Sequence, residues 1–450
     1  MSTALVDRLA AIVGPACISV DPDVLAARSV DWTGRYLGHA AALVRPGTAD
    51  AVAAVLRTCR DAGVCVTVQG GRTSLVAGTV PEHNDVLLST ERLIDIGDVD
   101  TVQQRVRAGA GVTLAALQHA ADAVRLLVGV DLAARDSATV GGMVSTNAGG
   151  LRTVRYGTMG DQVLGLEVAL PDGSVVHRQT AAYSERTGYD DASLFVGAEG
   201  TLGVITAVDV RLHPVPAHRV TALCGFADLE SLVAAGRVFR DVKTIAALEL
   251  IDSRAAALAS KHLGLPVPVS GAWLLLIELA DETDPIELLS DALDGIGVCA
   301  APAVGVDTVA QHRLWQVRES VADVVGLFGP PVKFDVSLPL SAIPSFEQRS
   351  AALIRRFAPA SLPLLFGHIG EGNLHLNVLQ CDAEQESRIY PEMMNLIAAL
   401  GGNVSSEHGV GSRKRAYLAM SRSPAEIAEM RAIKIALDPT GYLNPAVLFD

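Results

Sequence analysis

Near the end of the sequence, a short stretch of chain carries residue types that bind divalent metal ions. It contains His368, His375, Glu407 and His408, in a chain with only 11 histidines among 450 residues. Imidazole nitrogens and carboxylate oxygens are ligands of a borderline divalent metal such as zinc, and a further histidine beside them can act as a base. The stretch therefore predicts metal-assisted chemistry. The alternative is a set of unrelated polar residues that are buried and hydrogen-bonded.

The local pattern around the two earlier histidines is compatible with a metal site. His375 and Asn377 are two residues apart, so on a strand both side chains project to the same face. His368 precedes the Gly-Glu-Gly turn at residues 370–372 that leads into this strand. A turn and a strand that each supply a histidine, with a carboxylate from a distant segment, can assemble a metal site. Glu371 lies in the turn itself and is expected to be solvated or to lie behind the ligands.

The length and composition of the chain exclude some classes of protein and favour others. A chain of 450 residues is too long for one compact core, so two or three domains are expected. The formal charge of −14 argues against nucleic acid as a partner, because binding phosphates needs clustered Lys and Arg. Six scattered cysteines without a Cys-x-x-Cys pair predict free thiols in a reducing compartment. The apolar runs are too short to cross a bilayer, and the N-terminus reads as an amphipathic helix. A cytoplasmic protein that is not integral to a membrane is therefore expected.

The order of predicted elements indicates at least two domains. An Ala-rich helix is expected over 49–62, and strands are expected at 64–68, 86–88, 105–108, 165–170 and 200–206. Two prolines at 214 and 216 mark the best domain boundary. Beyond them the pattern of strand, helix and strand predicts an α+β domain on an antiparallel sheet, and a last helix is expected at 423–437.

Two glycine-rich segments stand out in the first half. One is residues 69–75, directly after a predicted strand, and the other is residues 137–150. Consecutive Gly and small hydroxyl residues let several backbone N–H groups converge on an anion such as a pyrophosphate. Neither segment is a P-loop, and no strand-linked Gly-x-Gly-x-x-Gly occurs, so nicotinamide binding through a Rossmann unit is not supported. Taken alone, each segment is either a tight turn or a ligand-binding loop.

Two ordered series of motifs resemble known flavoproteins. The first series is Arg45-Pro46-Gly47, Gln69-Gly70-Gly71 with Thr73, Asp131-Leu132, Gly141-Gly142 to Gly149-Gly150, and Glu199-Gly200-Thr201-Leu202-Gly203. It resembles the FAD-binding domain of the vanillyl-alcohol-oxidase-like flavoproteins. The second series is Trp315-x-x-Arg318-Glu319, Lys333 to Pro339, His368 to Asn377, Glu407 to Gly411, and Asp438-Pro439-x-Gly441-x-Leu443-Asn444-Pro445. It resembles the metal-dependent, FAD-linked D-2-hydroxy-acid dehydrogenases, which include D-2-hydroxyglutarate and D-lactate dehydrogenases.

The resemblance implies the fold class and the division into domains. It implies an α+β protein with a two-subdomain FAD-binding domain of the vanillyl-alcohol-oxidase type and an α+β substrate-binding cap built on an antiparallel sheet. The FAD-binding domain is expected over residues 1–216, and the substrate-binding and metal domain over 217–410. Residues 411–450 are expected to form a C-terminal helical segment that packs back on the FAD domain.

The resemblance also implies a reaction and the residues for it. FAD-dependent oxidation of a D-2-hydroxy acid to the 2-oxo acid is expected, with a metal ion holding the substrate and hydride passing to flavin N5. His368, His375 and Glu407 are the implied metal ligands, with zinc the first choice and manganese the alternative. His408 is the implied base, since a neutral imidazole can accept a hydroxyl proton near neutral pH. Its alternative role is to cap the glycine turn that follows.

Three residues are implied to bind the substrate. Arg318 and Lys333 would bind its carboxylates, because arginine offers a bidentate fork and lysine a point charge. Surface salt bridges are their alternative role. Asn377 would donate to the substrate or hold a ligand in place.

A larger set of residues is implied to bind FAD. No histidine lies in residues 69–75, where related enzymes attach the flavin covalently, so FAD is expected to bind non-covalently. The implied FAD-binding residues are Pro46, Gly70, Gly71, Arg72, Thr73, Ser74, Ser137, Gly141, Gly142, Thr146, Asn147, Gly149, Gly200, Ile205 and Asn444.

The chain departs from the family pattern at several positions near the expected cofactor. Ser74, Ala133 and Asp136 stand where the family has glycine, Arg72 where it has glycine or asparagine, and Met143 where it has asparagine. Most of these exchanges add bulk, and Asp136 adds a negative charge near the expected pyrophosphate. FAD affinity is therefore the property that these departures affect.

The particular substrate and the partners stay open at this stage. Residues 413–415 resemble the hydroxyglutarate subgroup, whereas Ala322 stands where that subgroup has threonine. D-2-Hydroxyglutarate is favoured over D-lactate or glycolate. Electrons are expected to pass to an acceptor protein or a quinone, and a homodimer is left open. Two alternatives of another class are a zinc-dependent hydrolase and a non-catalytic FAD-binding subunit.

Overall fold

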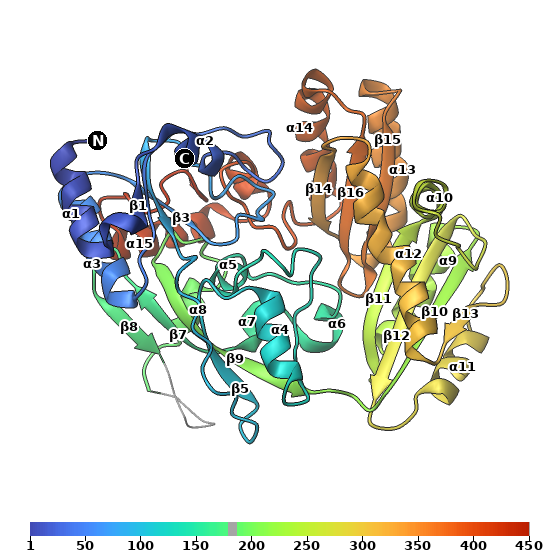
Figure 1. Ribbon diagram of the computed structural model, residues 1–450. Helices are drawn as coiled ribbons and strands as arrows, with labels where there is room; N and C mark the ends of the chain where they lie inside the picture. Colours follow the sequence, from blue (N-terminus) through green and yellow to red (C-terminus); the bar gives the residue numbers. More distant parts are fainter. Residues whose placement is uncertain (179–186, 450) are drawn as a thin grey trace. The chain divides into compact units, whose positions relative to one another are not determined.

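A computed structural model describes residues 1–178 and 187–449. The chain forms two compact units (Figure 1). The first unit comprises residues 1–149, 157–215 and 407–450, and the second comprises residues 150–156 and 216–406. No helix in the described part of the chain is both long and apolar enough to cross a membrane.

The first unit contains a small sheet close to the N-terminus. Its strand order is β1-β2-β4-β3, with β2, β4 and β3 parallel and β1 antiparallel at one edge. The strands are β1 (Ile18–Ser19), β2 (Ala40–Val44), β3 (Val66–Gln69) and β4 (Asp85–Ser89). The parallel strands are short and largely buried, as expected for strands covered on both faces.

A second sheet of the first unit is antiparallel. Its order is β5-β9-β7-β8, and β6 pairs with the far end of β9. Its strands are β5 (Arg105–Gly109), β6 (Leu126–Val128), β7 (Val163–Ala169), β8 (Val175–Arg178) and β9 (Val204–Pro214). The turn between β7 and β8 contains Gly173, which has a φ of +82°.

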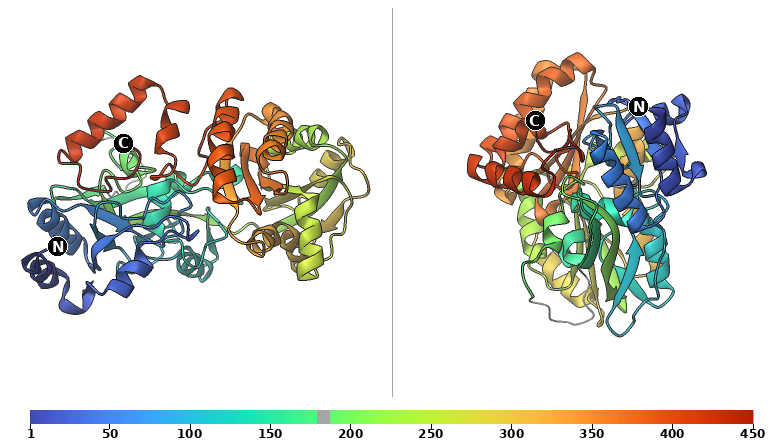
Figure 2. Two further views of the ribbon diagram at one scale, coloured as in Figure 1. Left: turned by 90° about the horizontal axis from the view of Figure 1, so that it is seen from above. Right: turned by 90° about the vertical axis from the view of Figure 1, so that its left-hand side faces the viewer.

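Helices cover these two sheets. They are α1 (Thr3–Val13), α2 (Pro22–Arg28), α3 (Ala49–Asp61), α4 (Leu114–Asp122), α5 (Val140–Thr146), α7 (Met159–Gln162), α8 (Ala192–Phe195) and α15 (Pro424–Leu437), with 3-10 turns η1 (Pro15–Cys17) and η4 (Arg415–Met420). The Thr48 side chain caps α3 by accepting from the N–H of Ala51. Helices α1 and α3, dark blue in Figure 2, pack side by side.

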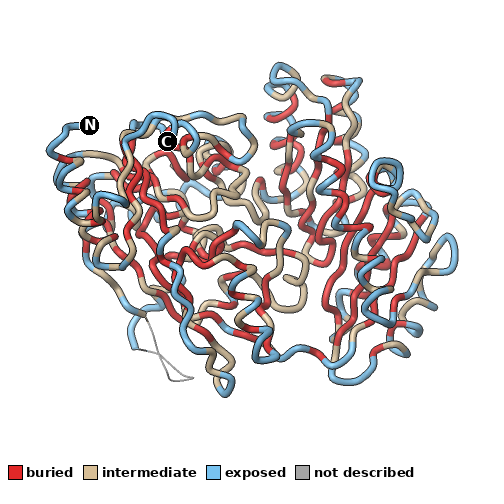
Figure 3. Tube along the Cα trace, viewed as in Figure 1, coloured by how far each residue is buried: buried red, intermediate tan, exposed pale blue. Residues whose placement is uncertain are grey.

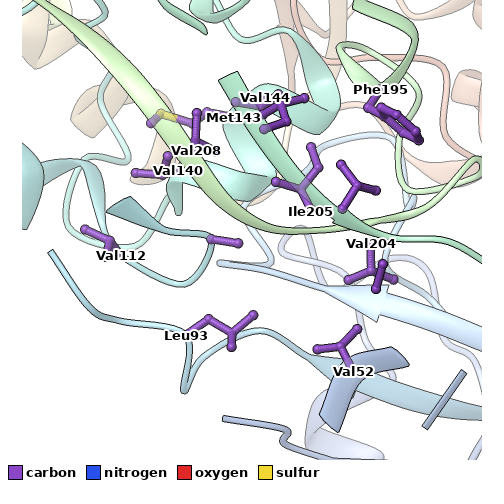
Figure 4. Close-up of a cluster of buried hydrophobic side chains, with 14 of the residues drawn as sticks. Val52, Leu93, Val112, Val140, Met143, Val144, Phe195, Val204, Ile205 and Val208 are labelled. Carbon is purple, nitrogen blue, oxygen red and sulfur yellow. The ribbon is translucent and has the colours of Figure 1, made fainter. Parts of the chain in front are cut away.

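One apolar core fills the first unit. Figure 4 shows side chains from α3, α5 and β9 meeting there with residues from the intervening loops. The labelled members are Val52, Leu93, Val112, Val140, Met143, Val144, Phe195, Val204, Ile205 and Val208. The core joins the two sheets of this unit.

The second unit is built on a seven-stranded sheet in which every pairing is antiparallel. Its order is β13-β10-β12-β11-β15-β16-β14. The strands are β10 (His218–Phe226), β11 (Ile245–Asp252), β12 (Trp273–Asp281), β13 (Ala303–Gly305), β14 (Val332–Ser337), β15 (Leu362–His368) and β16 (Asn373–Leu379). The central strands are buried on both faces (Figure 3). The antiparallel α+β architecture expected for this region is confirmed.

Helices lie on both faces of this sheet. They are α6 (Thr153–Tyr156), α9 (Leu229–Arg240), α10 (Ser253–Leu263), α11 (Ile286–Asp294), α12 (Thr308–Gly326), α13 (Ile343–Phe357) and α14 (Ala383–Ala399), with 3-10 turns η2 (Leu340–Ala342) and η3 (Ile369–Glu371). Apolar residues of α10 and α12 pack on one face, against Ile251 and Leu276. On the opposite face, the ring of Tyr390 from α14 lies 5.1 Å from that of Phe334.

Candidate active site

The pairing of four strands places a row of polar side chains on one face of the second unit's sheet. Asp335 of β14 lies opposite His375 of β16, and His375 lies opposite Phe366 of β15. Two residues beyond Phe366, His368 lies opposite Glu249 of β11. Because residues two apart share a face, these side chains all point to the side that α12 covers.

His368 is paired with a buried carboxylate. His368 is 6% exposed, and its Nδ1 lies 2.7 Å from Oε1 of Glu249, which has no exposed surface. Burial alone would raise the pKa of Glu249, but the neighbouring His368 and Arg318 hold it below its ordinary value. The ionised carboxylate accepts a hydrogen bond from Nδ1–H, so the ring lone pair is on Nε2, the nitrogen that can bind a metal.

His375 also faces a carboxylate. Its Nδ1 lies 3.9 Å from Oδ1 of Asp335, a residue that is only 2% exposed. The rings of His368 and His375 are 5.3 Å apart and almost perpendicular. Oδ2 of Asp335 accepts a hydrogen bond from the backbone N–H of Ser406. This bond ties the end of the second unit's chain to the same row.

Glu407 and His408 directly follow Ser406. Among the described residues, Asp335, His375, Glu407 and His408 form one group of potential metal ligands, with one ligand atom from each within 4.8 Å of the others. Nε2 of His408 lies 3.4 Å from Oε1 of Glu407. Mixed imidazole and carboxylate donors at this spacing fit a divalent metal such as zinc.

The sequence-predicted ligands are thus only partly brought into that group. It includes His375 and Glu407, and it contains Asp335, to which the sequence analysis gave no role. His368 lies outside the group, although its ring borders that of His375. Its carboxylate-bound Nδ1 is nevertheless the arrangement in which a metal-binding histidine is commonly found.

Two of the predicted substrate-binding residues face each other across the β14–β16 pair. Lys333 lies opposite Asn377, and burial lowers the pKa of the lysine. Asn377 is 3% exposed, and its Oδ1 has no hydrogen-bond partner within the described chain. A buried amide oxygen without a donor is costly, so this atom is suited to a ligand that brings one.

Arg318 reaches the row from α12. It is 6% exposed, and its Nε donates to Oε2 of Glu249 at 2.7 Å. Its guanidinium carbon lies 4.9 Å from the centre of the Phe366 ring. The bond to Glu249 uses Nε and leaves the two terminal nitrogens, which form the planar fork that binds a carboxylate.

The first glycine loop, in the first unit, offers backbone donors. Within the described chain, the N–H groups of residues 70–75 donate to no acceptor, and these residues are half-buried. Arg72 has a φ of +56°, and its side chain donates to the backbone of Ala27. Such a run of open N–H groups fits an anionic group such as the pyrophosphate of FAD.

The second glycine loop is packed against the first. A Cβ on Gly70 would lie 2.6 Å from Oγ1 of Thr139, and one on Gly71 would run into the carbonyl oxygen of Ser137. The N–H groups of Gly141 and Gly142 are bonded within the protein. These glycines therefore let two backbone segments approach each other, whereas the open donors belong to the first loop.

The remaining predicted FAD-binding residues are distributed over the first unit, and several hold its turns together. Oδ1 of Asn147 accepts from the N–H of Gly160, and Oδ1 of Asn444 accepts from the N–H of Val68. Thr146 donates to the carbonyl of Gly142. The others are Pro46 after β2, Thr73 and Ser74 in the first loop, Gly149 after α5, Gly200 beside Asn444, and Ile205 in the core of Figure 4.

Two buried carboxylates of the row were missed by the sequence analysis. Glu249 is the one charged residue in the apolar segment 245–251, and Asp335 lies between Phe334 and Val336. A charge inside an otherwise apolar strand indicates a buried partner. That signal was available, but it does not identify the partner.

Comparisons with known proteins match both halves of the chain. Residues 40–178 match the family described as FAD binding domain, and residues 215–448 match the family described as FAD linked oxidases, C-terminal domain. The mitochondrial D-2-hydroxyglutarate dehydrogenase of Bos taurus is 36% identical, over 98% of this chain and 82% of that protein. D-2-Hydroxyglutarate dehydrogenase of Stutzerimonas stutzeri is 31% identical over 99% of both chains.

Solved structures share the fold. The 4-ethylphenol oxidase of Gulosibacter chungangensis has a TM-score of 0.80 at 17% identity, covering 99% of this chain and 97% of that one. p-Cresol methylhydroxylase with substrate bound has a TM-score of 0.80 at 17% identity, covering 99% and 96%. These likenesses confirm the expected fold class, an FAD-binding domain of the vanillyl-alcohol-oxidase type together with an α+β unit on an antiparallel sheet.

Proposed function

The chain belongs to the FAD-linked oxidases, and we propose that it oxidises a D-2-hydroxy acid to the corresponding 2-oxo acid. D-2-Hydroxyglutarate is the first candidate substrate, because the relatives reported above carry that name. D-Lactate and glycolate are the alternatives within the family. The match of residues 40–178 to an FAD-binding domain argues against the zinc-hydrolase alternative.

The observation that carries the proposal is the polar row of the second unit. Two histidines that each face a buried carboxylate lie on the same sheet face as Arg318, Lys333 and Asn377. Metal donors and anion-binding cations are thereby arranged side by side. A 2-hydroxy acid carries one carboxylate and one hydroxyl on neighbouring carbons, and it needs both kinds of group at once.

We assign the metal ligands to His368, His375 and Glu407, and the first candidate metal is zinc. Glu249 and Asp335 stand behind the two histidines and would fix the orientation of each ring. A divalent ion bound there would lower the pKa of the substrate's hydroxyl group. Asp335 is the alternative fourth donor, since it belongs to the group of closely spaced ligand atoms.

The base in this proposal is His408. Its Nε2 lies beside Oε1 of Glu407, so a substrate hydroxyl held by the metal would lie within reach of the imidazole. A neutral imidazole accepts the hydroxyl proton, so no positive charge builds up on the oxygen as the 2-oxo group forms. The proton transfer would contribute about 10²- to 10⁴-fold to the rate.

Arg318, Lys333 and Asn377 would hold the acid. The two terminal nitrogens of Arg318 would bind a carboxylate in the bidentate mode, and the Lys333 ammonium would add a second positive charge. The orphaned Oδ1 of Asn377 would accept a hydrogen bond from a protonated group of the ligand or of its neighbours.

The first unit would bind FAD non-covalently. The domain assignment is an FAD-binding domain over residues 1–216, a substrate and metal domain over 217–410, and a C-terminal segment from 411 that packs on the FAD domain. Open N–H groups in residues 70–75 support the placement of the pyrophosphate at the first glycine loop. FAD, when bound, supplies the hydride acceptor.

The electron acceptor in this proposal is a carrier protein or a quinone. We place the chain in the cytoplasm, on the support of six free cysteines in the described chain. The cattle relative, in contrast, is named as mitochondrial.

A dye-linked assay tests the proposed reaction. Purified protein is mixed with an artificial electron acceptor and with D-2-hydroxyglutarate, D-lactate or glycolate, and with the L-enantiomers of the first two. Dye reduction by a D-acid, lost in metal-depleted protein and restored by zinc or manganese, is the expected result. Equal rates for both enantiomers, or activity that does not respond to metal, would contradict the proposal.

A further inference from the structure

We infer that Glu249 is a positioning residue that couples the metal site to the substrate carboxylate site. One oxygen of its carboxylate orients His368, and the other orients Arg318. This inference rests on the proposed function, and it assigns a role to a residue outside the predicted set of ligands and substrate contacts.

The geometry around Glu249 is symmetric in its two contacts. Oε1 lies 2.7 Å from Nδ1 of His368, and Oε2 accepts from Nε of Arg318 at the same distance of 2.7 Å. The carboxylate has no solvent exposure, and His368 and Arg318 are each 6% exposed. Charge-assisted hydrogen bonds in a dry environment are short and strongly directional.

Three different elements bring these residues together. Glu249 projects from the middle of β11, directly opposite His368 at the end of β15, and Arg318 descends from α12 onto the same sheet face. Phe366, two residues before His368, lies under the guanidinium group of Arg318. The arginine is therefore held at its Nε by Glu249 and at its plane by an aromatic ring.

Each contact leaves the functional atoms of its partner available. When Glu249 accepts from Nδ1 of His368, the imidazole has its lone pair on Nε2, where a metal can bind. When it accepts from Nε of Arg318, the two terminal nitrogens remain for a carboxylate. A shift of this one side chain would therefore change metal affinity and substrate affinity together.

Replacing Glu249 by the corresponding amide should change the tautomer of His368. In Glu249→Gln, only one of the two terminal side-chain atoms is an acceptor, and the charged arginine is the stronger donor to it. The amide N–H₂ then faces Nδ1 of His368 and donates to it, which moves the imidazole proton to Nε2. That tautomer cannot bind a metal through Nε2 until the proton is lost.

The chain offers a matched control. Glu278 on the neighbouring strand β12 is 3% exposed, and its Oε2 accepts from Nε1 of Trp315 on the same helix, α12. It shares the burial, the sheet face and the helix of Glu249, whereas its partners Trp315 and Arg152 are not predicted metal ligands. Glu278→Gln and Glu278→Ala therefore report the cost of disturbing a buried carboxylate in this layer.

The experiment measures zinc affinity of the metal-free, flavin-loaded protein by competition with a chromogenic chelator. We expect Glu249→Gln to raise the Kd for zinc by at least about tenfold. Glu249→Ala is expected to raise both the Kd for zinc and the KM for the D-acid by at least about tenfold. Both Glu278 variants should keep both constants within about threefold of wild type while thermal stability falls.

The outcomes separate the inference from the function on which it rests. If wild-type protein binds zinc but both Glu249 variants match it within threefold, the positioning role is wrong and the proposed function stands. If the Glu278 variants lose zinc equally, the effect is general destabilisation and the inference fails. If the wild-type protein itself binds no zinc and is not reduced by any D-acid, the proposed function fails, and the inference fails with it. Should Glu249→Ala not fold, the Kd for zinc of the isosteric variant Glu249→Gln alone tests the positioning role.

Discussion

Oε2 of Glu199 accepts a hydrogen bond of 2.8 Å from the backbone N–H of Gly411, 212 residues further along the chain. The other carboxylate oxygen accepts from Val410 at the same distance. Gly409, with a φ of +81°, lies so close to this carboxylate that a Cβ would come within 2.8 Å of it. One half-buried carboxylate thus holds the segment that follows His408, the proposed base.

This contact predicts a pH dependence of stability. Burial raises the pKa of Glu199 to about 7 from 4.5, although the two backbone hydrogen bonds and Lys414 oppose the shift. Between pH 4.5 and about 7, the folded chain holds more protons at Glu199 than the unfolded chain does. The contribution of this carboxyl group to the free energy of unfolding is therefore fully present below pH 4.5 and is lost as the pH rises through about 7. The loss amounts to at most about 3 kcal/mol, at about 1.4 kcal/mol per pKa unit.

Urea denaturation at pH 5 and pH 8 measures this effect. The free energy of unfolding of wild type, measured relative to that of Glu199→Gln, should be lower at pH 8 than at pH 5. Glu230→Gln, at an exposed helix position, is the control and should show no such trend. Parallel pH profiles for wild type and Glu199→Gln would contradict the assignment.

His408→Ala should separate cofactor binding from chemistry. Without the imidazole, no group at this position accepts the hydroxyl proton, so flavin reduction by the D-acid should slow by about 10²- to 10⁴-fold. Flavin content and zinc content should stay close to wild type. Stopped-flow absorbance measures the reduction rate, and His218→Ala, an exposed histidine on β10, is the matched control. Full activity in His408→Ala would rule out its role as base.

Ala322→Thr should shift the preference between substrates. Ala322 lies one turn beyond Arg318 on α12 and is exposed, so the added hydroxyl should change stability by less than about 0.5 kcal/mol. A hydroxyl beside the arginine fork can bond a distal carboxylate, which D-2-hydroxyglutarate has and D-lactate lacks. The ratio of kcat/KM for D-2-hydroxyglutarate over D-lactate should rise about tenfold. An unchanged ratio would place the distal carboxylate elsewhere.

Gly71→Ala should lower both FAD affinity and stability. A Cβ at this position would meet the carbonyl oxygen of Ser137, so the two glycine loops would have to separate. The displaced first loop would no longer present the N–H groups of residues 70–75 together. We expect at least about tenfold weaker FAD binding, an effect of about 1.4 kcal/mol, measured by fluorescence titration of the apoprotein. Gly297→Ala, where a Cβ would meet no atom within 4 Å, is the control and should bind FAD as wild type does.

Much of the fold followed from local pattern. The helix expected at 49–62 is α3, and the strand expected at 165–170 overlaps β7. Strand starts were less accurate, for physical reasons. The strand expected from Val64 begins at Val66, because the N–H of Val64 donates to Cys59 at the end of α3. The strand expected from Gly200 begins at Val204, after a turn with positive φ at Glu199 and Gly200.

The environment of the site could not be predicted in the same way. Glu249 meets partners 69 and 119 residues away, and only the pairing of β11 with β15 under α12 brings them together. The contacts of residues 150–156 could not be predicted from local sequence either. Arg155 follows the second glycine loop in the sequence, but it donates to the backbone carbonyls of Thr244 and Ala280 within the second unit. Local sequence identifies chemistry-bearing residues, and tertiary pairing decides which of them meet.

The central claim is that a D-2-hydroxy acid reduces a bound flavin with the help of a metal held by this chain. The most direct measurement is the anaerobic visible spectrum of the purified protein before and after adding D-2-hydroxyglutarate, and then D-lactate, each with and without EDTA. The account predicts a flavin band that is bleached by a D-acid, and a bleaching that is lost after chelation and regained with zinc or manganese. A protein without a flavin band, or a band that bleaches equally well without metal, would contradict it.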